Sequence, residues 1–334
     1  MNSTKLIFAT AIFLMSAMPF LAQQQERHPG IILYEQGKYR EAVSALDKAS
    51  NQKEFKASAE VFNYLGLALI ETGESKKATK NLGKAVALNP TNQAYRVNLA
   101  YAYLRNRQVD KAQSETEAVI KVDPKNISAY FLHGTANLWE GKLDSADNDA
   151  DSMLAIDRAY PEAYIMKSDV LIARMGAKVG AGSMIKDEIT LLKAATDILS
   201  TGVVNCKNST NFKKIESEFE SVNAFYSHFA NRKPWVPGTV VAAEPGVEPL
   251  KILSKQKASY TEAARKAGVQ GTIQLAVLFS ANGRIENLML IKGLGYGLDQ
   301  QAMTAARRIT FAPMKRDGKP VSTVKLMEYS FAIY

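Results

Sequence analysis

The spacing of hydrophobic residues divides the chain into two regions with different periods. From about residue 30 to residue 230, apolar residues recur every three to four positions, which is typical of amphipathic helices. From Gly271 onward the pattern changes towards alternation, which predicts strands. Between the two regions, the segment 231–249 (NRKPWVPGTVVAAEPGVEP) holds four of the chain's 11 prolines, so we expect a semi-rigid linker there.

The helical region repeats itself with a period of 34 residues. Pro90 and Pro124 close two similar phrases, AVALNPTN and VIKVDPKN. Other positions recur in the same register: Leu65-Gly66, Leu99-Ala100 and His133-Gly134, and then Ala78, Ala112 and Ala146. Small side chains allow two helices to touch, and proline stops a helix before the next unit begins. The pattern predicts a stack of antiparallel helix pairs, in which Leu65, Leu69 and Leu82 fill the space between helices.

A period of 34 residues with small residues at these positions resembles the tetratricopeptide repeat. Four to five units are expected, since the fifth is degenerate, with starts near Gly30, Ala59, Gln93, Ile127 and Pro161. The glycine-rich segment MGAKVGAGS should interrupt the fifth unit as a loop before a helix over 186–199. A final amphipathic helix over 212–230 is predicted to cap the solenoid with a polar outer face.

The resemblance also implies a binding groove, because the first helix of each tetratricopeptide repeat lines the concave side of the solenoid. The residues that fall at the groove positions are Asn63, Leu67, Ile70, Val97, Tyr101, Leu104, Phe131 and Leu138. A groove of aromatic and aliphatic side chains suits an extended or helical peptide. The same residues could instead pack one repeat on the next, and the sequence leaves both interpretations open.

The region after the linker has a mixed pattern. Its expected elements are a helix over 259–267, a strand over 271–279, an Asn282-Gly283 hairpin turn, a strand over 285–291, a helix over 298–309, an Asp317-Gly318 turn and a strand over 322–334. Asp299 near the start of its helix favours the helix dipole. This order predicts a small α+β module with an antiparallel sheet.

The module resembles the C-terminal domain of the TonB family over residues 248–334. The matching motifs are Tyr260 to Arg265 with Gly268 and Gly271, Asn282 to Ile285, Gly297-Leu298-Asp299 with Ala302, Arg307 to Pro313, and Gly318 with Pro320 and Val321. Thr261 stands where the family has proline, and Ile309 where it has tryptophan. These two departures affect a turn and a core position.

In TonB proteins this domain lies in the periplasm and binds an extended peptide of an outer-membrane transporter, which adds as a strand to a sheet edge. The resemblance makes the last strand the docking edge. Its expected contact residues are Val324, Lys325, Leu326, Met327, Tyr329 and Phe331. The alternative is that this strand is central in the sheet or pairs with itself in a domain-swapped homodimer.

The N-terminus has the pattern of an export signal. Lys5 precedes 17 uncharged residues, Leu6 to Ala22, which is short for a spanning helix and suits a signal peptide with a mature start at Gln23. Phe20 stands where a small residue is preferred, so an uncleaved anchor through residues 6–22 is the alternative. Energy transducers of the TonB family need an anchoring helix with a histidine, and this chain has no histidine before His28.

The positive charge of the chain is concentrated in the module. The whole chain has a net charge of +9, and residues 248–334 contain 13 lysines and arginines against six acids. No nucleic-acid motif accompanies this charge, so nucleic acid is not an expected target. The charge favours an acidic peptide, an anionic envelope surface or peptidoglycan.

No catalytic constellation stands out. The single cysteine, Cys206, and the three histidines offer little for a metal site, and no metal or cofactor is expected. The three Ser-x-x-Lys matches lack the partner motifs of penicillin-binding enzymes. The acidic series Asp147, Asp149 and Asp151 is interpreted as a solvated helix face.

The sequence therefore predicts an all-α solenoid of tetratricopeptide helix pairs followed by a small α+β TonB-like domain with an antiparallel sheet. The expected divisions are 1–22 (signal or anchor), 23–232 (solenoid), 233–247 (linker) and 248–334 (TonB-like domain). The predicted function is that of a non-catalytic periplasmic scaffold that docks envelope proteins or peptides. An outer-membrane receptor is one candidate partner. The alternatives are a membrane-anchored energy transducer and an enzyme built on the insertion around Gly176 to Lys186, within a segment 173–186 whose role the sequence leaves open.

Overall fold

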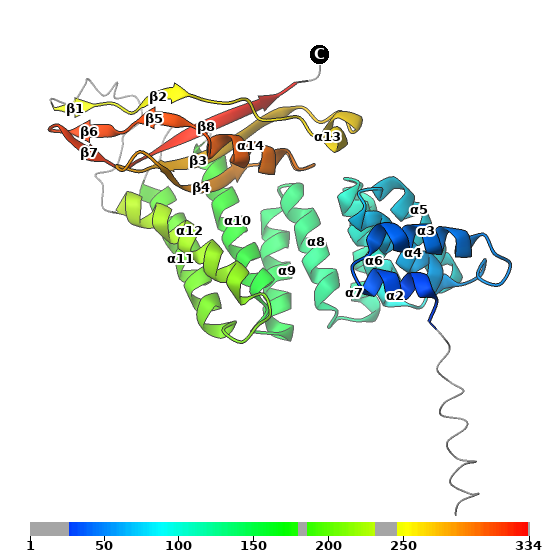
Figure 1. Cartoon of the computed structure of the whole chain (residues 1–334). Coiled ribbons are helices and arrows are strands. Elements are labelled where there is room, and N and C mark those ends of the chain that lie inside the picture. The colour runs from blue at the N-terminus through cyan, green and yellow to red at the C-terminus, as the bar shows by residue number, and fades with distance from the viewer. Residues whose placement is uncertain (1–26, 180–185, 231–245, 333–334) are drawn as a thin grey trace, which may run out of the picture. The chain divides into compact units, whose positions relative to one another are not determined.

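The computed structural model describes residues 27–179, 186–230 and 246–332, and the chain separates into two units, residues 1–119 and 120–334. Antiparallel helix pairs make up the described part of the first unit (Figure 1). Its helices are α2 (Pro29–Glu35), α3 (Tyr39–Ser50), α4 (Ala59–Glu71), α5 (Ser75–Leu88), α6 (Gln93–Arg105) and α7 (Val109–Val122), the last of which crosses the boundary.

Asparagines that follow the repeat prolines start the next helices. The side chain of Asn92 accepts hydrogen bonds from the amides of Ala94 and Tyr95, at 3.0 and 3.3 Å. Asn126 accepts one from the amide of Ala129, at 3.1 Å. Each phrase of the form Pro-x-Asn thus stops one helix and caps the next. The predicted starts at Gln93 and Ile127 are confirmed.

Gly66 allows α4 and α5 to touch. A β-carbon at Gly66 would lie 2.4 Å from Cγ of Leu82, far inside van der Waals contact. Leu65, Leu69 and Leu82 are all buried in the core of this unit, as the repeat pattern predicts. The small residue therefore sets the spacing between the two helices of the repeat.

The second unit begins with five more helices in its described part, namely α8 (Ile127–Trp139), α9 (Leu143–Ile156), α10 (Pro161–Val179), α11 (Lys186–Asn205) and α12 (Phe212–Ala230). One prediction was wrong here. The segment MGAKVGAGS was expected to form a loop from Met175, whereas α10 continues through Gly176 to Val179. A single glycine costs a helix only about 1 kcal/mol, which the preceding turns of α10 can offset. Residues 180–185 lie outside the described residues.

The rest of the second unit is the α+β module. Its strands are β1 (Val247–Glu248), β2 (Lys251–Ser254), β3 (Gly271–Phe279), β4 (Ile285–Lys292), β5 (Thr310–Ala312), β6 (Met314–Arg316), β7 (Lys319–Val321) and β8 (Thr323–Phe331), and its helices are α13 (Glu262–Lys266) and α14 (Leu298–Ala306). The main sheet has the antiparallel order β4-β3-β8. The pairs β2-β5 and β1-β6-β7 form two smaller sheets, which the sequence did not predict.

The two faces of the main sheet pack against different helices. On one face, alternate residues of β3 such as Ile273, Leu275 and Val277 join α14 in a buried core. On the other face, Ala276 and Leu278 pack with residues of α10, α11 and α12. Strands place successive side chains on opposite faces, and here both faces are apolar.

The position of α12 corrects the prediction of a solenoid cap. The sequence analysis expected a polar outer face, but Val222 and Phe225 of α12 are fully buried in the cluster that includes Met289 of β4. The sheet thus covers the end of the helical stack, which needs no polar cap there. Within the described residues, no helix has both the length and the apolar character needed to cross a membrane; the segment 6–22 lies outside them.

Candidate protein-binding site

The groove residues predicted in the first unit differ in their burial. Asn63, Ile70 and Leu104 are buried, and the side chain of Asn98 donates a hydrogen bond to the side-chain oxygen of Asn63 at 2.8 Å. Leu67, Val97 and Tyr101 are half-buried and keep surface that a ligand can contact. The three buried residues therefore hold the repeats together, while the three half-buried ones form the accessible part of the predicted groove.

Tyrosines contribute to this unit in a way that the sequence analysis missed. The ring of Tyr34 packs against those of Tyr39 and Tyr64, each with centroids 5.5 Å apart. Burial raises the pKa of Tyr34, and the nearby Glu71 carboxylate raises it further. Tyrosine offers a large contact area with little loss of side-chain entropy and is enriched at interfaces. Its recurrence at Tyr34, Tyr64 and Tyr101 in successive first helices could have signalled the cluster.

Phe131 and Leu138, the predicted groove residues of the second unit, are both half-buried on α8. They line a cleft of about 780 Å³, together with residues of α10, α12 and β4. These two predicted residues thus line the same cleft as a strand of the TonB-like module, which the sequence could not show.

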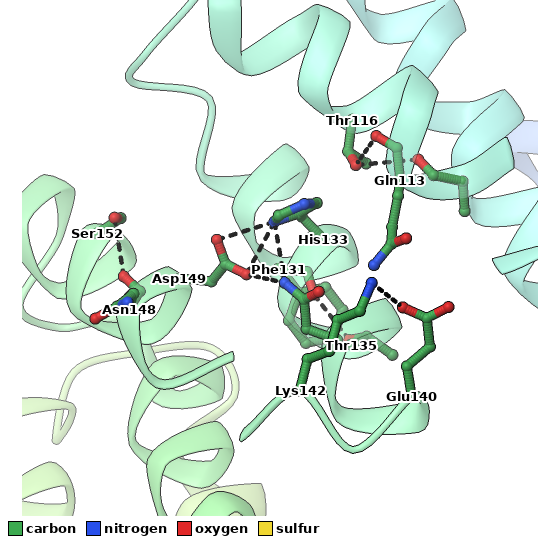
Figure 2. A network of polar contacts seen from close by, with 12 residues as sticks. Gln113, Thr116, Phe131, His133, Thr135, Glu140, Lys142, Asn148, Asp149 and Ser152 are labelled. Carbon is green, nitrogen blue, oxygen red and sulfur yellow. Dashed lines mark hydrogen bonds and ion pairs between the residues drawn. The ribbon is translucent and has the colours of Figure 1, made fainter. Parts of the chain in front are cut away.

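A polar network ties α8 to α9 beside these residues (Figure 2). Nδ1 of His133 lies 3.1 and 2.9 Å from the two carboxylate oxygens of Asp149, and the side-chain amide of Asn137 donates to Asp149 at 2.8 Å. A carboxylate only accepts hydrogen bonds, so Nδ1 carries the proton. Asp149 is 7% exposed. The burial of Asp149 corrects the expectation that all three acids lie on a solvated helix face. Asp147 and Asp151 are more exposed, and each forms an ion pair with Lys167 at 2.8 Å.

Strand β8 forms an edge of the main sheet. It pairs with β3 from Thr323 opposite Phe279 to Phe331 opposite Gly271, and no strand among the described residues pairs with its other side. An edge strand presents unpaired amide and carbonyl groups to an incoming strand. The described sheet therefore has β8 at its edge and not at its centre.

The six predicted edge residues divide between the two faces of β8. Met327, Tyr329 and Phe331 are buried in the core, and Val324 packs on the helical side of the sheet. Lys325 and Leu326 are exposed, Leu326 by 39%. A ligand at this edge would meet the backbone of β8 and these two side chains first.

A groove of about 410 Å³ runs beside the second half of β8, from Glu328 to Ala332, and its other wall is the segment 255–260. Nζ of Lys255 donates to the carbonyl oxygen of Glu328 at 2.6 Å and lies 4.6 Å from the centroid of the Tyr329 ring. The Tyr329 hydroxyl is buried and has no hydrogen-bond partner in the described structure. Burial raises its pKa to about 12, so it remains a neutral donor. The groove thus offers backbone groups and a cation, while the Tyr329 hydroxyl lies buried.

The chain's single thiol is placed for packing. Cys206 is fully buried next to the C-terminal end of α11, and burial raises the pKa of its thiol to about 11. Since the thiolate is the reactive form, a thiol of this kind is a poor nucleophile.

Comparison with known proteins agrees with both halves of the structure. Residues 256–333 match the family model of the Gram-negative bacterial TonB protein C-terminal domain, and residues 30–93 and 69–132 match two tetratricopeptide-repeat models. Serine/threonine-protein phosphatase 5 of Homo sapiens and of Rattus norvegicus is 30% identical over 81 residues, which is 24% of this chain and 16% of the phosphatase. The similarity thus covers less than a fifth of the length of those relatives.

Two solved structures are also similar to part of the chain. A crystal structure of MamA is 20% identical with a TM-score of 0.44, and covers 53% of this chain and 96% of its own. A thermophilic TPR protein of Thermus thermophilus is 18% identical with a TM-score of 0.44, and covers 58% of this chain and 95% of its own. From the motifs, the helix pairs, the sheet and the family models together, the chain combines tetratricopeptide repeats with a TonB C-terminal domain.

Proposed function

We propose that this protein is a non-catalytic scaffold of the Gram-negative cell envelope that docks proteins or peptides through its repeats and through the β8 edge of its TonB-like domain. The outer side of β8, with which no strand of the described residues pairs, carries the proposal. Tetratricopeptide repeats and TonB C-terminal domains both act in protein–protein interaction, and their combination in one chain favours a bridging role.

Binding at β8 would extend the sheet by one strand. Backbone hydrogen bonds would supply affinity for any extended segment, and side chains in the adjoining groove would select among segments. Lys255 and Lys325 would favour acidic residues in the partner, in keeping with the excess of positive charge on residues 248–334. An outer-membrane receptor with an extended acidic segment is the kind of partner that fits.

Site-specific photo-crosslinking tests this role without removing the module, whose loss would expose the apolar face of α12. A photoreactive amino acid replaces Leu326 on β8, and the matched control replaces Val204 on α11, which is 72% exposed. Discrete crosslinked partners at position 326 that are absent at position 204 are expected. The same adducts at both positions, or none at 326, would contradict docking at β8.

The scaffold and the anchored transducer differ at the N-terminus. A cleaved signal peptide gives an exported protein that starts at Gln23, whereas a transducer keeps residues 6–22 as its anchor. Intact mass measurement of the protein purified from the envelope distinguishes them. The scaffold predicts a start at Gln23, and an intact N-terminus in the membrane fraction would support the transducer.

A further inference from the structure

A second cleft in residues 120–334 lies between the helices and the opposite edge of the sheet. It has a volume of about 780 Å³, within the range of ligand pockets, and is walled by α8, α10, α12 and β4. It is a different surface from the β8 groove, because β4 and β8 lie on opposite sides of β3.

The outer edge of β4 forms one wall of this cleft. All seven consecutive residues from Ile285 to Ile291 line it. Side chains of a strand alternate between its faces, so a cleft that every residue of the strand lines runs along the strand's edge. No strand in the described residues pairs with this side of β4. Its eight residues span about 26 Å, enough for an extended segment of similar length.

The facing helical wall is apolar with embedded carboxylates. Phe131, Leu138, Ile165 and Ile172 supply hydrophobic surface. Five carboxylates and only two cations line the cleft as a whole: Glu162, Asp169, Glu218, Glu220 and Glu286, against Lys214 and Arg307. The lining therefore has the opposite sign to the module as a whole.

Asp169 and Glu218 are among the four of these carboxylates that form no ion pair in the described structure, the others being Glu220 and Glu286. Asp169 and Glu218 make no hydrogen bond or ion pair there. The Asp169 side chain is exposed at the cleft, and desolvation by the surrounding protein raises its pKa to about 7. The negative charge of Glu218 also raises the pKa of Asp169, whereas the positive charge of Lys214 lowers it.

Glu162 gives an independent sign of a missing ligand group. It is 7% exposed, and its Oε1 accepts from Asn211 at 2.8 Å and lies 3.7 Å from Nζ of Lys214. Its Oε2 is buried with no hydrogen-bond partner in the described structure. A buried carboxylate oxygen without a donor is unfavourable. A donor from a bound molecule would satisfy it.

We propose that this cleft binds an extended peptide segment that carries lysine or arginine side chains and pairs its backbone with the outer edge of β4. Its cationic side chains reach Glu162, Asp169 and Glu218, and its apolar side chains pack on α8 and α10. This site is separate from the proposed docking edge at β8. It selects a cationic segment, whereas the β8 edge favours an acidic one.

Binding at the cleft can be followed through Trp139, which lines it and is 43% exposed. The chain has two tryptophans, so the variant Trp235→Phe leaves Trp139 as the reporter. Four blocked synthetic peptides serve as probes. They are Lys-Thr-Lys-Val-Lys-Thr-Lys, its glutamate counterpart, and two forms of the lysine peptide with N-methyl groups on alternate backbone nitrogens, one for each register.

The lysine peptide is expected to change the Trp139 fluorescence with saturation, and the glutamate peptide to leave it unchanged. N-methylation in one register should weaken binding at least tenfold, since it blocks the backbone hydrogen bonds to β4. Glu162→Gln and Asp169→Asn should each weaken it at least fivefold. Glu216→Gln, an exposed α12 position outside the cleft lining, should change it less than twofold.

Four results would overturn the proposal: no response to the lysine peptide, equal binding of the glutamate peptide, equal binding of both N-methylated forms, or equal effects of Glu162→Gln and Glu216→Gln. Dimerisation through the cleft that the lysine peptide does not reverse would also overturn it, because a second copy of the chain would then be the occupant. Crosslinking at Leu326 reports on β8 alone, so either site can fail without the other.

Discussion

Nζ of Lys255 donates a hydrogen bond to the backbone carbonyl oxygen of Glu328 on the edge strand β8, 2.6 Å away. Lysine at an open sheet edge is a common means of preventing unwanted strand pairing. Here it occupies a backbone carbonyl of the edge strand. If a partner strand docks at β8 as proposed, Lys255 would have to move when that strand binds.

Replacement of Lys255 by methionine should free this edge. We expect Lys255→Met to raise the fraction of self-associated protein severalfold, because two copies of β8 can then pair more easily. Sedimentation velocity over a range of concentrations measures this fraction. Lys257→Met, in the same groove but without a bond to β8, is the control. Equal self-association of the two variants would show that Lys255 does not protect the edge.

The spacing of α4 and α5 depends on Gly66. Gly66→Ala would place a methyl group 2.4 Å from Cγ of Leu82 and should lower the free energy of unfolding by about 1–3 kcal/mol. Gly83→Ala is the matched control, since nothing lies within 4 Å of its added β-carbon. The control should be neutral or stabilising by up to about 1 kcal/mol. Urea unfolding compares them, and a Gly66→Ala protein as stable as Gly83→Ala would refute tight contact here.

The buried network on α8 and α9 should contribute strongly to stability. Asp149→Ala removes the acceptor for both His133 and Asn137 and should cost about 2–3 kcal/mol. Asp147→Ala breaks only a partly exposed pair with Lys167, and should cost less than about 1 kcal/mol. Thermal and urea unfolding measure both. If the two substitutions cost the same, the network around Asp149 has no special role.

Asp169 should make stability depend on pH. Its pKa of about 7 in the folded state lies above the ordinary value of 3.8, so the folded state binds more protons between these values. The contribution of Asp169 to the free energy of unfolding is then fully present below about pH 4, and it is lost as the pH rises through about 7. Asp169→Asn should therefore gain stability over the parent protein at pH 8 and little at pH 4.5.

The control for this pH effect is Glu216→Gln, which alters an exposed carboxyl on α12. Its stability difference from the parent protein should hardly change with pH. A constant difference for Asp169→Asn across pH 4.5 to 8 would contradict the raised pKa.

Local signals predicted the helix pairs and the main hairpin closely. The Pro-x-Asn phrases fix the starts of α6 and α8, and Asn282-Gly283 marks the turn between β3 and β4. These features depend on residues near in sequence, where proline, asparagine and glycine have strong conformational preferences.

Long-range packing was harder to predict. The sheets β1-β6-β7 and β2-β5 are built from strands of two to four residues that come from distant parts of the module, and such short strands leave almost no periodic pattern. Phe225 and Val222 are buried against the sheet, but their spacing in the sequence is that of any amphipathic helix and does not show what covers them. For the same reason Phe131 and Leu138 could be assigned to a groove, but the cleft that they share with β4 could not be foreseen.

Hydrogen exchange of the β8 amides tests the central claim, docking at the β8 edge, most directly. The full chain is compared alone and in complex with the partner segment that crosslinks to position 326. The proposal predicts that outward-facing amides between Val324 and Phe331 exchange at least tenfold more slowly in the complex, while β3, already paired on both sides, changes little. Unchanged exchange along β8 in a saturated complex would contradict it.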